Sequence, residues 1–207
     1  DWDFLEALEA SRCVRASTGW TPRHLLAHSA NGELRGAAPI YLKTHSRGEF
    51  VFDHGWADAL ERAGGRYYPK LLCAAPFTPV PGRRLLVAPG PDARRVQTLL
   101  AAGAVQLARD AGLSSAHFNF LTEAEQTLLA EAGLLARTDQ QFHWFNPGYA
   151  SFEDFLGALA SRKRKMIRKE RLAAQDGLRL VRLSGADLRP EHWDAFFDFY
   201  QDTGGRK

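Results

Sequence analysis

The chain has 207 residues, 45% of them hydrophobic and 25% charged, so it can build a packed core and global disorder is excluded. Its longest apolar runs, at 71–77 and 99–105, fall far short of the roughly 20 residues that a membrane-spanning helix needs. Two cysteines, Cys13 and Cys73, cannot form a disulfide framework, and a reducing compartment, most simply the cytoplasm, is predicted.

The formal net charge of +3 hides a strongly basic segment at residues 162–171. That segment contains seven Lys or Arg residues and a single acidic residue, Glu170, which gives it a charge of +6. The remainder of the chain therefore carries −3. The basic character of the protein belongs to one segment and not to the whole surface.

Hydrophobic periodicity, turn residues and helix caps predict an antiparallel meander followed by alternating strands and helices. Strands are expected at residues 23–29, 34–45, 49–52, 67–74, 83–87, 115–121 and 134–145. Helices are expected at residues 3–13, 57–63, 92–111 and 122–133. Asn31-Gly32 is typical of a hairpin turn, Asp92 is placed to cap a helix, and Thr122 with Glu125 has the spacing of a capping box.

After a linker at 146–150, the sequence predicts helices at 152–160, 161–175 and 190–202 and one strand at 178–183. A lone strand leaves its backbone donors and acceptors unpaired, so it is expected to join the first sheet or a larger second domain. The ending, residues 203–207, has the composition of a loop.

Two short clusters offer polar groups beside aromatic rings. Asp53, His54 and Trp56 follow a predicted strand, and Tyr67, Tyr68 and Lys70 open the next extended segment. Such a mixture suits a pocket for a polar substrate, but it equally suits a hydrogen-bonded histidine with aromatic rings packed at a sheet edge. Farther on, Gln141 and His143 share one face of a predicted strand, so His143 either faces a cleft or has a structural role.

Other familiar chemistry is disfavoured by the sequence. His24 and His28 lie on a predicted strand, where four residues span about 13 Å, too far to share one metal ion, and no metal is expected. The chain has no Gly-x-Ser-x-Gly, no Gly-x-Gly-x-x-Gly and no P-loop. Cys73 lies among apolar residues and is interpreted as a buried structural thiol.

The basic helix at 161–175 has three interpretations. The helix is either a solvated face, a binding site for the phosphates of a small anionic substrate, or a surface that binds nucleic acid such as tRNA. Met166 and Ile167 add a narrow apolar stripe, which indicates that one side of the helix docks on another element.

Several stretches together resemble the FemAB-like group of the GNAT acyltransferase superfamily, whose members form peptidoglycan bridges or are described as peptidoglycan biosynthesis or recognition proteins. They include FDHGWAD at 52–58 and RYYPK at 66–70. The stretches that carry the resemblance are residues 18–24, 52–58, 66–70, 76–83, 140–144 and 161–171. They are distributed over most of the chain and are specific only in combination.

The resemblance implies an α/β (α+β) fold of tandem GNAT-like domains. Residues 1–148 would be a first domain with a mixed, mostly antiparallel sheet flanked by helices. Residues 149–207 would be the truncated start of a second domain, lacking the acyl-donor half. The turn at 89–92, Pro-Gly-Pro-Asp, departs from the donor loop of acetyltransferases, so the first domain is not expected to bind coenzyme A.

The resemblance also implies a function and site residues. It predicts N-acyl or aminoacyl transfer to an amine, with a peptidoglycan precursor as one candidate acceptor, acyl-CoA or aminoacyl-tRNA as donor, and no obligatory cofactor. Arg164 and Arg168 are expected to contact phosphates, with Lys70 as a further candidate, and His54 or Asp53 to act as general base. The alternatives are a non-catalytic module for an anionic glycan or nucleotide conjugate, and a tRNA or nucleic-acid binder.

Overall fold

The structure is a computed structural model that describes residues 2–205. The chain divides into two compact units, Asp1–Asp139 and Gln140–Lys207. Between residues 2 and 205, no helix combines the length and apolar character that crossing a bilayer requires.

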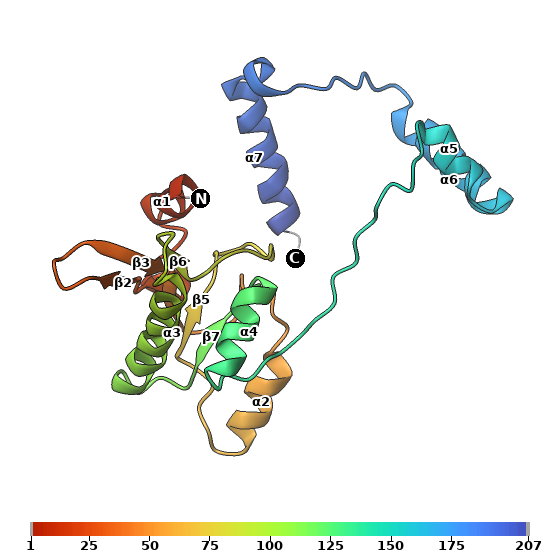
Figure 1. Ribbon diagram of the computed structural model, residues 1–207. Coiled ribbons are helices and arrows are strands. Elements are labelled where there is room, and N and C mark those ends of the chain that lie inside the picture. The colour runs from red at the N-terminus through yellow and green to blue at the C-terminus, as the bar shows by residue number, and fades with distance from the viewer. Residues whose placement is uncertain (1, 206–207) are drawn as a thin grey trace. The chain divides into compact units, whose positions relative to one another are not determined.

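The first unit contains four α-helices, a short 3-10 helix and seven strands within the described residues (Figure 1). The helices are α1 (Trp2–Ala10), η1 (Ala16–Thr18), α2 (His54–Arg62), α3 (Ala93–Asp110) and α4 (Glu123–Glu131). The strands are β1 (Trp20–Pro22), β2 (Leu25–His28), β3 (Leu34–Ala38), β4 (Ile40–Lys43), β5 (Lys70–Cys73), β6 (Leu86–Val87) and β7 (Ala116–Phe118).

The second unit is helical in its described part. Its elements are α5 (Phe152–Gly157), α6 (Ser161–Gln175), the 3-10 helix η2 (Gly185–Asp187) and α7 (Pro190–Gly205). The predicted basic helix is confirmed with the same bounds as α6. The prediction of a loop at the end of the chain is wrong for residues 203–205, which continue α7.

The strands form two open sheets, so the fold is mixed α/β. The four-stranded sheet has the order β1-β4-β5-β7, in which only β5 and β7 run parallel. The three-stranded sheet has the order β2-β3-β6 and is antiparallel throughout. The predicted hairpin at Asn31-Gly32 is confirmed, because this turn joins β2 to β3.

The prediction of one strand over 34–45 is corrected at Pro39. Residues before it pair with β2 in the three-stranded sheet, and residues after it pair with β1 in the four-stranded sheet. Proline has no N–H to give to a ladder, so the strand breaks there and the chain passes from one sheet to the other.

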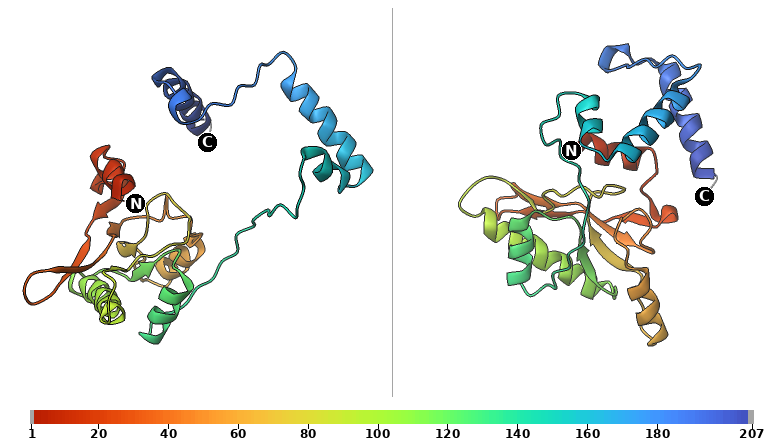
Figure 2. Two further views of the ribbon diagram at one scale, coloured as in Figure 1. Left: turned by 45° about the horizontal axis from the view of Figure 1, so that its top comes forward. Right: turned by 90° about the vertical axis from the view of Figure 1, so that its right-hand side faces the viewer.

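Helix α3 lies along β2 and β3 and covers the main apolar core (Figures 1 and 2). It buries Leu100, Ala101, Ala104 and Ala108, a spacing that places all four on one helical face. Gly36 permits this close approach, since a Cβ there would lie 2.9 Å from Val96 Cγ1.

Three predicted strands are wrong. Residues 49–52 form a loop, because Gly48 and Phe50 have φ of +79° and +55°, and the Glu49 side chain is buried. Residues 134–145 and 178–183 have no partner strand among residues 2–205 and adopt no regular structure. Alternating apolar residues alone do not hold a strand without a ladder to satisfy its backbone.

The capping box of α4 is confirmed and also joins two parts of the fold. Thr122 accepts a hydrogen bond from the backbone N–H of Glu125. The buried Glu125 carboxylate accepts hydrogen bonds from the backbone N–H groups of Arg84 and Leu85, at 2.8 and 2.7 Å. This carboxylate therefore holds the segment before β6 against the start of α4.

We predict that Glu125→Ala lowers the free energy of unfolding by about 2–4 kcal/mol, because two buried backbone N–H groups lose their acceptor. Urea unfolding followed by circular dichroism measures the loss. Glu123→Ala, an exposed carboxylate in the same helical turn, is the control and should cost less than about 1 kcal/mol. Equal losses in the two variants would contradict the role given to Glu125.

Candidate functional site

One face of the four-stranded sheet carries two lysines directly opposite each other. Lys43 of β4 and Lys70 of β5 are register partners, and both side chains are fully buried. Two ammonium groups in such positions repel each other, and burial adds a large desolvation cost. The fold must therefore bring negative charge to this face.

The loop between β4 and α2, residues 44–53, supplies that charge. Glu49 Oε2 lies 2.9 Å from Lys70 Nζ, and Asp53 Oδ2 lies 2.8 Å from it. Lys70 Nζ also donates to Ser46 Oγ at 2.8 Å. Lys70 thus has two hydrogen-bond acceptors, Ser46 and Asp53, and a further ion-pair partner, Glu49, all from this loop.

The second lysine has weaker partners. Lys43 Nζ lies 4.0 Å from Glu49 Oε1 and donates to the carbonyl of Arg47 at 3.4 Å. It also lies 3.5 Å from the centroid of a Trp20 ring, a cation–π contact. Burial lowers the pKa of Lys43 to about 7, against the opposing effect of Glu49.

Two tyrosines complete the buried network. Tyr67 OH donates to Asp53 Oδ2 at 2.8 Å, and the Tyr68 hydroxyl shares a hydrogen bond with Ser46 Oγ at 2.8 Å. The two rings meet edge to face, 5.0 Å apart. We call Lys43, Lys70, Glu49, Asp53, Ser46, Tyr67 and Tyr68 the lysine network.

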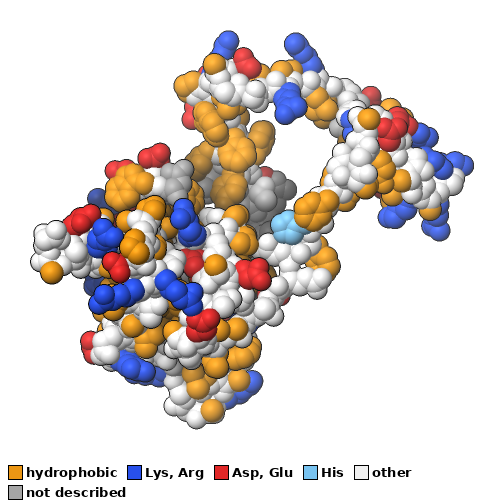
Figure 3. Space-filling model, in the orientation of Figure 1, with side chains coloured by type: hydrophobic (Ala, Val, Ile, Leu, Met, Phe, Trp, Pro, Cys, Tyr) orange, Lys and Arg blue, Asp and Glu red, His pale blue; other side chains and the backbone are white. Residues whose placement is uncertain are grey.

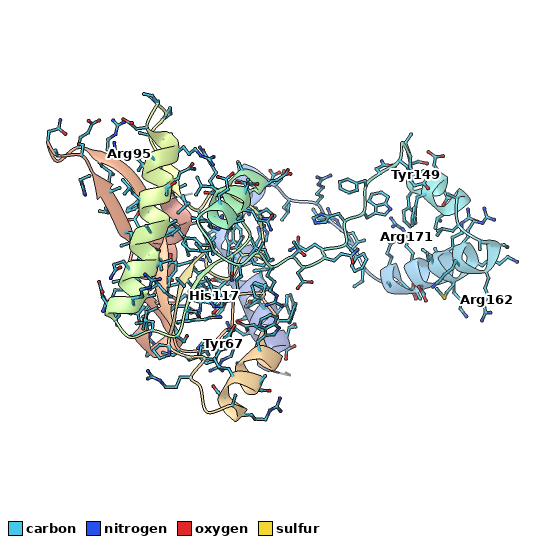
Figure 4. All side chains as sticks on the ribbon, turned by 60° about the horizontal axis from the view of Figure 1, so that its bottom comes forward. Tyr67, Arg95, His117, Tyr149, Arg162 and Arg171 are labelled. Atoms are coloured by element: carbon cyan, nitrogen blue, oxygen red, sulfur yellow. The ribbon has the colours of Figure 1, made fainter. Side chains whose placement is uncertain are left out.

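His117 of β7 borders the lysine network. Figure 4 shows it beside Tyr67. The rings of His117 and Tyr67 are 6.1 Å apart, and the imidazole Nε2 is 2.8 Å from Ser115 Oγ. Burial, and then the charge of Lys70, lower the pKa of His117 to about 4, so the imidazole is neutral at pH 7.

The two carboxylates of the network have pKa values shifted in opposite directions. Burial would raise the pKa of Asp53, but hydrogen bonds from Lys70, Ser46 and Tyr67 outweigh it and lower that pKa. Burial raises the pKa of Glu49, although Lys70 opposes this shift. Asp53 is thus held as a carboxylate at neutral pH, which suits a structural anion better than a general base.

The structure brings four of the predicted site residues together: Asp53, Tyr67, Tyr68 and Lys70. His54 and Trp56 lie on α2, and both side chains are exposed. The Trp56 ring is covered in part by Arg137, whose Cζ lies 5.7 Å from its centroid. The backbone N–H of Trp56 donates to the Asp53 carbonyl at 3.0 Å, but within residues 2–205 neither the His54 nor the Trp56 side chain bonds to the lysine network. The general-base role of His54 stays a prediction.

His143 belongs to the second unit, where the expected strand face does not exist. Its side chain is exposed, with Nε2 3.3 Å from Gln141 Oε1 and its ring stacked on Phe145 at 6.1 Å. A substrate role for His143 is still a prediction.

Sequence reasoning missed Lys43, Ser46, Glu49 and His117. Lys43 lies in a predicted strand two residues after an apolar Tyr41, so its side chain points to the same face. That charge within an otherwise apolar strand is the signal that a counter-ion is needed nearby. The prediction of a strand at 49–52 places Glu49 in a ladder, so the sequence does not reveal Glu49 as the counter-ion of the buried lysines.

In the second unit, the turn before α5 shapes an aromatic hollow. Asn146 Oδ1 accepts from the backbone N–H groups of Gly148 and Tyr149, and Ser151 with Asp154 forms a capping box on α5. The hollow has a volume of ≈ 560 Å³. It is lined by Trp144, Asn146, Tyr149, Ala150, Ser151, Phe152 and Phe155.

Helical spacing sorts the basic residues of α6 onto two faces. Arg164 donates to the carbonyl of Gly157 at 3.4 Å, Arg168 pairs with Glu153, and Arg171 lies 4.5 Å from the centroid of the Phe152 ring. We call Arg164, Arg168 and Arg171 the inner arginines. Figure 4 shows Arg171 on the α5 side and Arg162 pointing away from it.

The outer face of α6 carries the remaining cations. Arg162, Lys163, Lys165 and Lys169 are exposed, and Figure 3 shows blue side chains projecting from this part of the molecule. The inner arginines contact α5, but the predicted docking through Met166 and Ile167 is not confirmed, because α6 has no buried residue and Met166 is exposed. The expectation of a purely solvated helix fits only the outer face.

Metal and thiol chemistry find no further support. Within residues 2–205, no group of three or more His, Cys, Asp or Glu is placed to hold a metal ion. Cys73 is buried, which confirms that prediction, and burial raises the pKa of its thiol.

Comparison with protein-family models finds a match over residues 1–207 to the FemAB-like model, described as peptidoglycan biosynthesis/recognition. No curated protein and no solved structure matches the chain.

We predict that the free energy of unfolding rises between pH 7 and about pH 8, below the ordinary pKa values of cysteine, about 8.5, and tyrosine, about 10. In this window the unfolded chain keeps a proton on Lys43, whose ordinary pKa is 10.5, whereas the folded chain has released it near pH 7. Lys43→Met should flatten the rise in urea-unfolding curves measured across that window. Lys163→Met, which removes an exposed lysine, should leave the rise unchanged, and a Lys43→Met curve as steep as the parent's would refute the assignment.

Proposed function

The chain belongs to the FemAB-like family of peptidoglycan biosynthesis and recognition, and from that premise we propose that it takes part in acyl or aminoacyl transfer to the amine of an anionic cell-wall precursor. The donor we propose is an aminoacyl-tRNA or an acyl-CoA. Action in the cytoplasm is part of this proposal, in keeping with the reducing compartment that the cysteine content indicates.

The observation that carries the proposal is the pairing of the inner arginines with the aromatic hollow of the second unit. Phe152 takes part in both, because it lines the hollow and lies under the Arg171 guanidinium. Flat aromatic rings stack on bases and sugars, and guanidinium forks match phosphate oxygens. A nucleotide-linked precursor presents these two chemistries together.

The inner arginines are available to such a ligand. Arg168 and its partner Glu153 are both about half exposed or more, and exposed ion pairs contribute roughly 0–1 kcal/mol. A phosphate can therefore replace the carboxylate at small cost. Lys70, by contrast, is fully buried between two carboxylates and the Ser46 hydroxyl, so we assign it to holding the sheet face and place phosphate contact on Arg164 and Arg168.

The chemistry itself requires no covalent intermediate on the protein. An amine must be deprotonated, held in line with the acyl carbon, and the developing oxyanion must meet hydrogen-bond donors. Asp53 is poorly suited to accept the proton, because its pKa is lowered by its hydrogen bonds. Of the two predicted bases, we therefore favour the exposed His54.

The GNAT-like arrangement is part of the proposal. A mixed, mostly antiparallel sheet, with its parallel strands β5 and β7 joined through α3, supports a GNAT-like first domain over residues 1–148. Residues 149–207 would then open a second such domain. The break between compact units, after Asp139, lies a little before that boundary.

A second function, binding of a nucleic acid such as tRNA, rests on a separate observation. Arg162, Lys165 and Lys169 recur at helical spacing on the outer face of α6 and are exposed. Such a stripe suits a polyanion, whose binding weakens steeply with salt.

We predict that Arg164→Ala/Arg168→Ala weakens binding of a UDP-linked muropeptide at least about tenfold, because two charge-assisted contacts are lost. Isothermal titration calorimetry on the whole chain measures the affinity. Arg162→Ala/Lys169→Ala removes the same charge from the outer face and should leave this affinity within about twofold.

Three results would count against the proposal. They are no binding of the muropeptide by the parent chain, equal loss in both double variants, and loss only in the outer-face variant. The last result, together with a steep salt dependence of tRNA binding, would favour the nucleic-acid function.

A further inference from the structure

A second hollow lies in the first unit, where the turn after α1 meets the loop after β4. Its volume is ≈ 410 Å³, and no Asp or Glu is among the described residues that line it. Trp20, His45, Arg47, Gly48 and Phe77 contribute to its walls. No residue of α6 takes part, so this hollow is independent of the proposed function.

One wall is aromatic and depends on a glycine. Gly48 has φ of +79°, and a Cβ at this position would lie 2.6 Å from the Phe77 ring. The backbone N–H of Phe77 donates to the Gly48 carbonyl at 3.1 Å, and the Phe77 ring lies 5.2 Å from the Trp20 ring. Only glycine combines this backbone conformation with so close a ring, so the wall is fixed by the local fold.

His45 also lines the hollow. Its Nδ1 accepts a hydrogen bond from the backbone N–H of Arg47 at 3.2 Å, so a neutral ring carries its proton on Nε2. Burial, followed by the charges of Lys43 and Arg47, lowers the pKa of His45. Of these two basic residues, Arg47 lines the hollow itself.

Two hydrogen-bond donors at the hollow have no partner in the described chain. The Trp20 indole Nε1–H is buried and donates to no acceptor among residues 2–205. The Arg47 side chain is exposed and has neither an ion pair nor a side-chain hydrogen bond among those residues. The Lys43 amine, under the same Trp20 ring, has one hydrogen-bond acceptor only among those residues, the carbonyl of Arg47.

Unpaired donors, positive charge and the absence of acidic lining residues are complementary to a negatively charged oxygen group. We propose that this hollow binds an oxyanion, the carboxylate or phosphate of a small ligand, with the Arg47 guanidinium and the Trp20 indole N–H as its donors. The arginine supplies a positive charge and several N–H donors in a fixed geometry. The buried indole N–H gains the hydrogen-bond acceptor that residues 2–205 do not provide.

The test is a titration of the ¹⁵N-labelled whole chain with inorganic phosphate and, separately, acetate, at ionic strength held constant with sodium chloride. The five tryptophan indole N–H signals are followed by NMR. Trp20→Phe assigns the Trp20 signal. If that variant does not fold, the four exposed residues Trp2, Trp56, Trp144 and Trp193 are replaced instead, and assignment follows by elimination.

We expect a saturable movement of the Trp20 indole signal with at least one of the two anions. Movement with phosphate alone or acetate alone identifies the source of the oxyanion, and movement with both indicates a site for either. Arg47→Ala should weaken the apparent affinity at least about tenfold. Arg109→Ala, an exposed arginine on α3 with the same charge change, should leave it unchanged.

Two results would overturn the inference. One is a Trp20 signal that does not move with either anion, and the other is an Arg47→Ala titration that matches the parent. Neither bears on the inner arginines, so failure here is distinguishable from failure of the proposed function.

Discussion

Two ammonium groups face each other inside the first unit, and the surrounding structure follows from the need to neutralise them. Lys43 and Lys70 are register partners on β4 and β5 with no access to solvent. Removing a charge from water is costly, and only close opposite charge with full hydrogen bonding offsets it. The loop at 44–53 therefore turns inward and places Glu49 and Asp53 over the lysines. Helix α2 begins immediately after Asp53, so this ion pairing also fixes where His54 and Trp56 emerge.

The same loop has a second side. Ser46, Glu49 and Asp53 point into the lysine network, whereas His45, Arg47 and Gly48 line the hollow proposed to bind an oxyanion. Trp20 links the two regions, because its ring contacts Lys43 and also forms a wall of the hollow. An anion in the hollow would thus lie near a lysine whose pKa is lowered to about 7 by burial. Anion binding would favour the protonated form of that lysine.

The features that sequence could predict are those set by local chemistry. The hairpin at Asn31-Gly32, the capping box of Thr122 and Glu125, and helix α6 all depend on neighbouring residues, and the structure has each of them. The clustering of Asp53 with Tyr67, Tyr68 and Lys70 was also anticipated as a mixed polar and aromatic group. The strand expected at 49–52 failed because a distant lysine, and not local propensity, decides where Glu49 goes. The strand expected at 178–183 failed because a ladder needs a partner, which residues 2–205 do not provide.

The central claim is that Lys70 and the loop carboxylates stabilise one another, and a double-mutant cycle tests it most directly. Lys70→Met, Asp53→Asn and the double variant are unfolded in urea, and the coupling free energy is taken from the three losses. We predict a coupling of about 2 kcal/mol or more, with the double variant losing clearly less than the sum of the single losses. A coupling near zero would show that the two side chains are buried side by side without depending on each other, which contradicts the account.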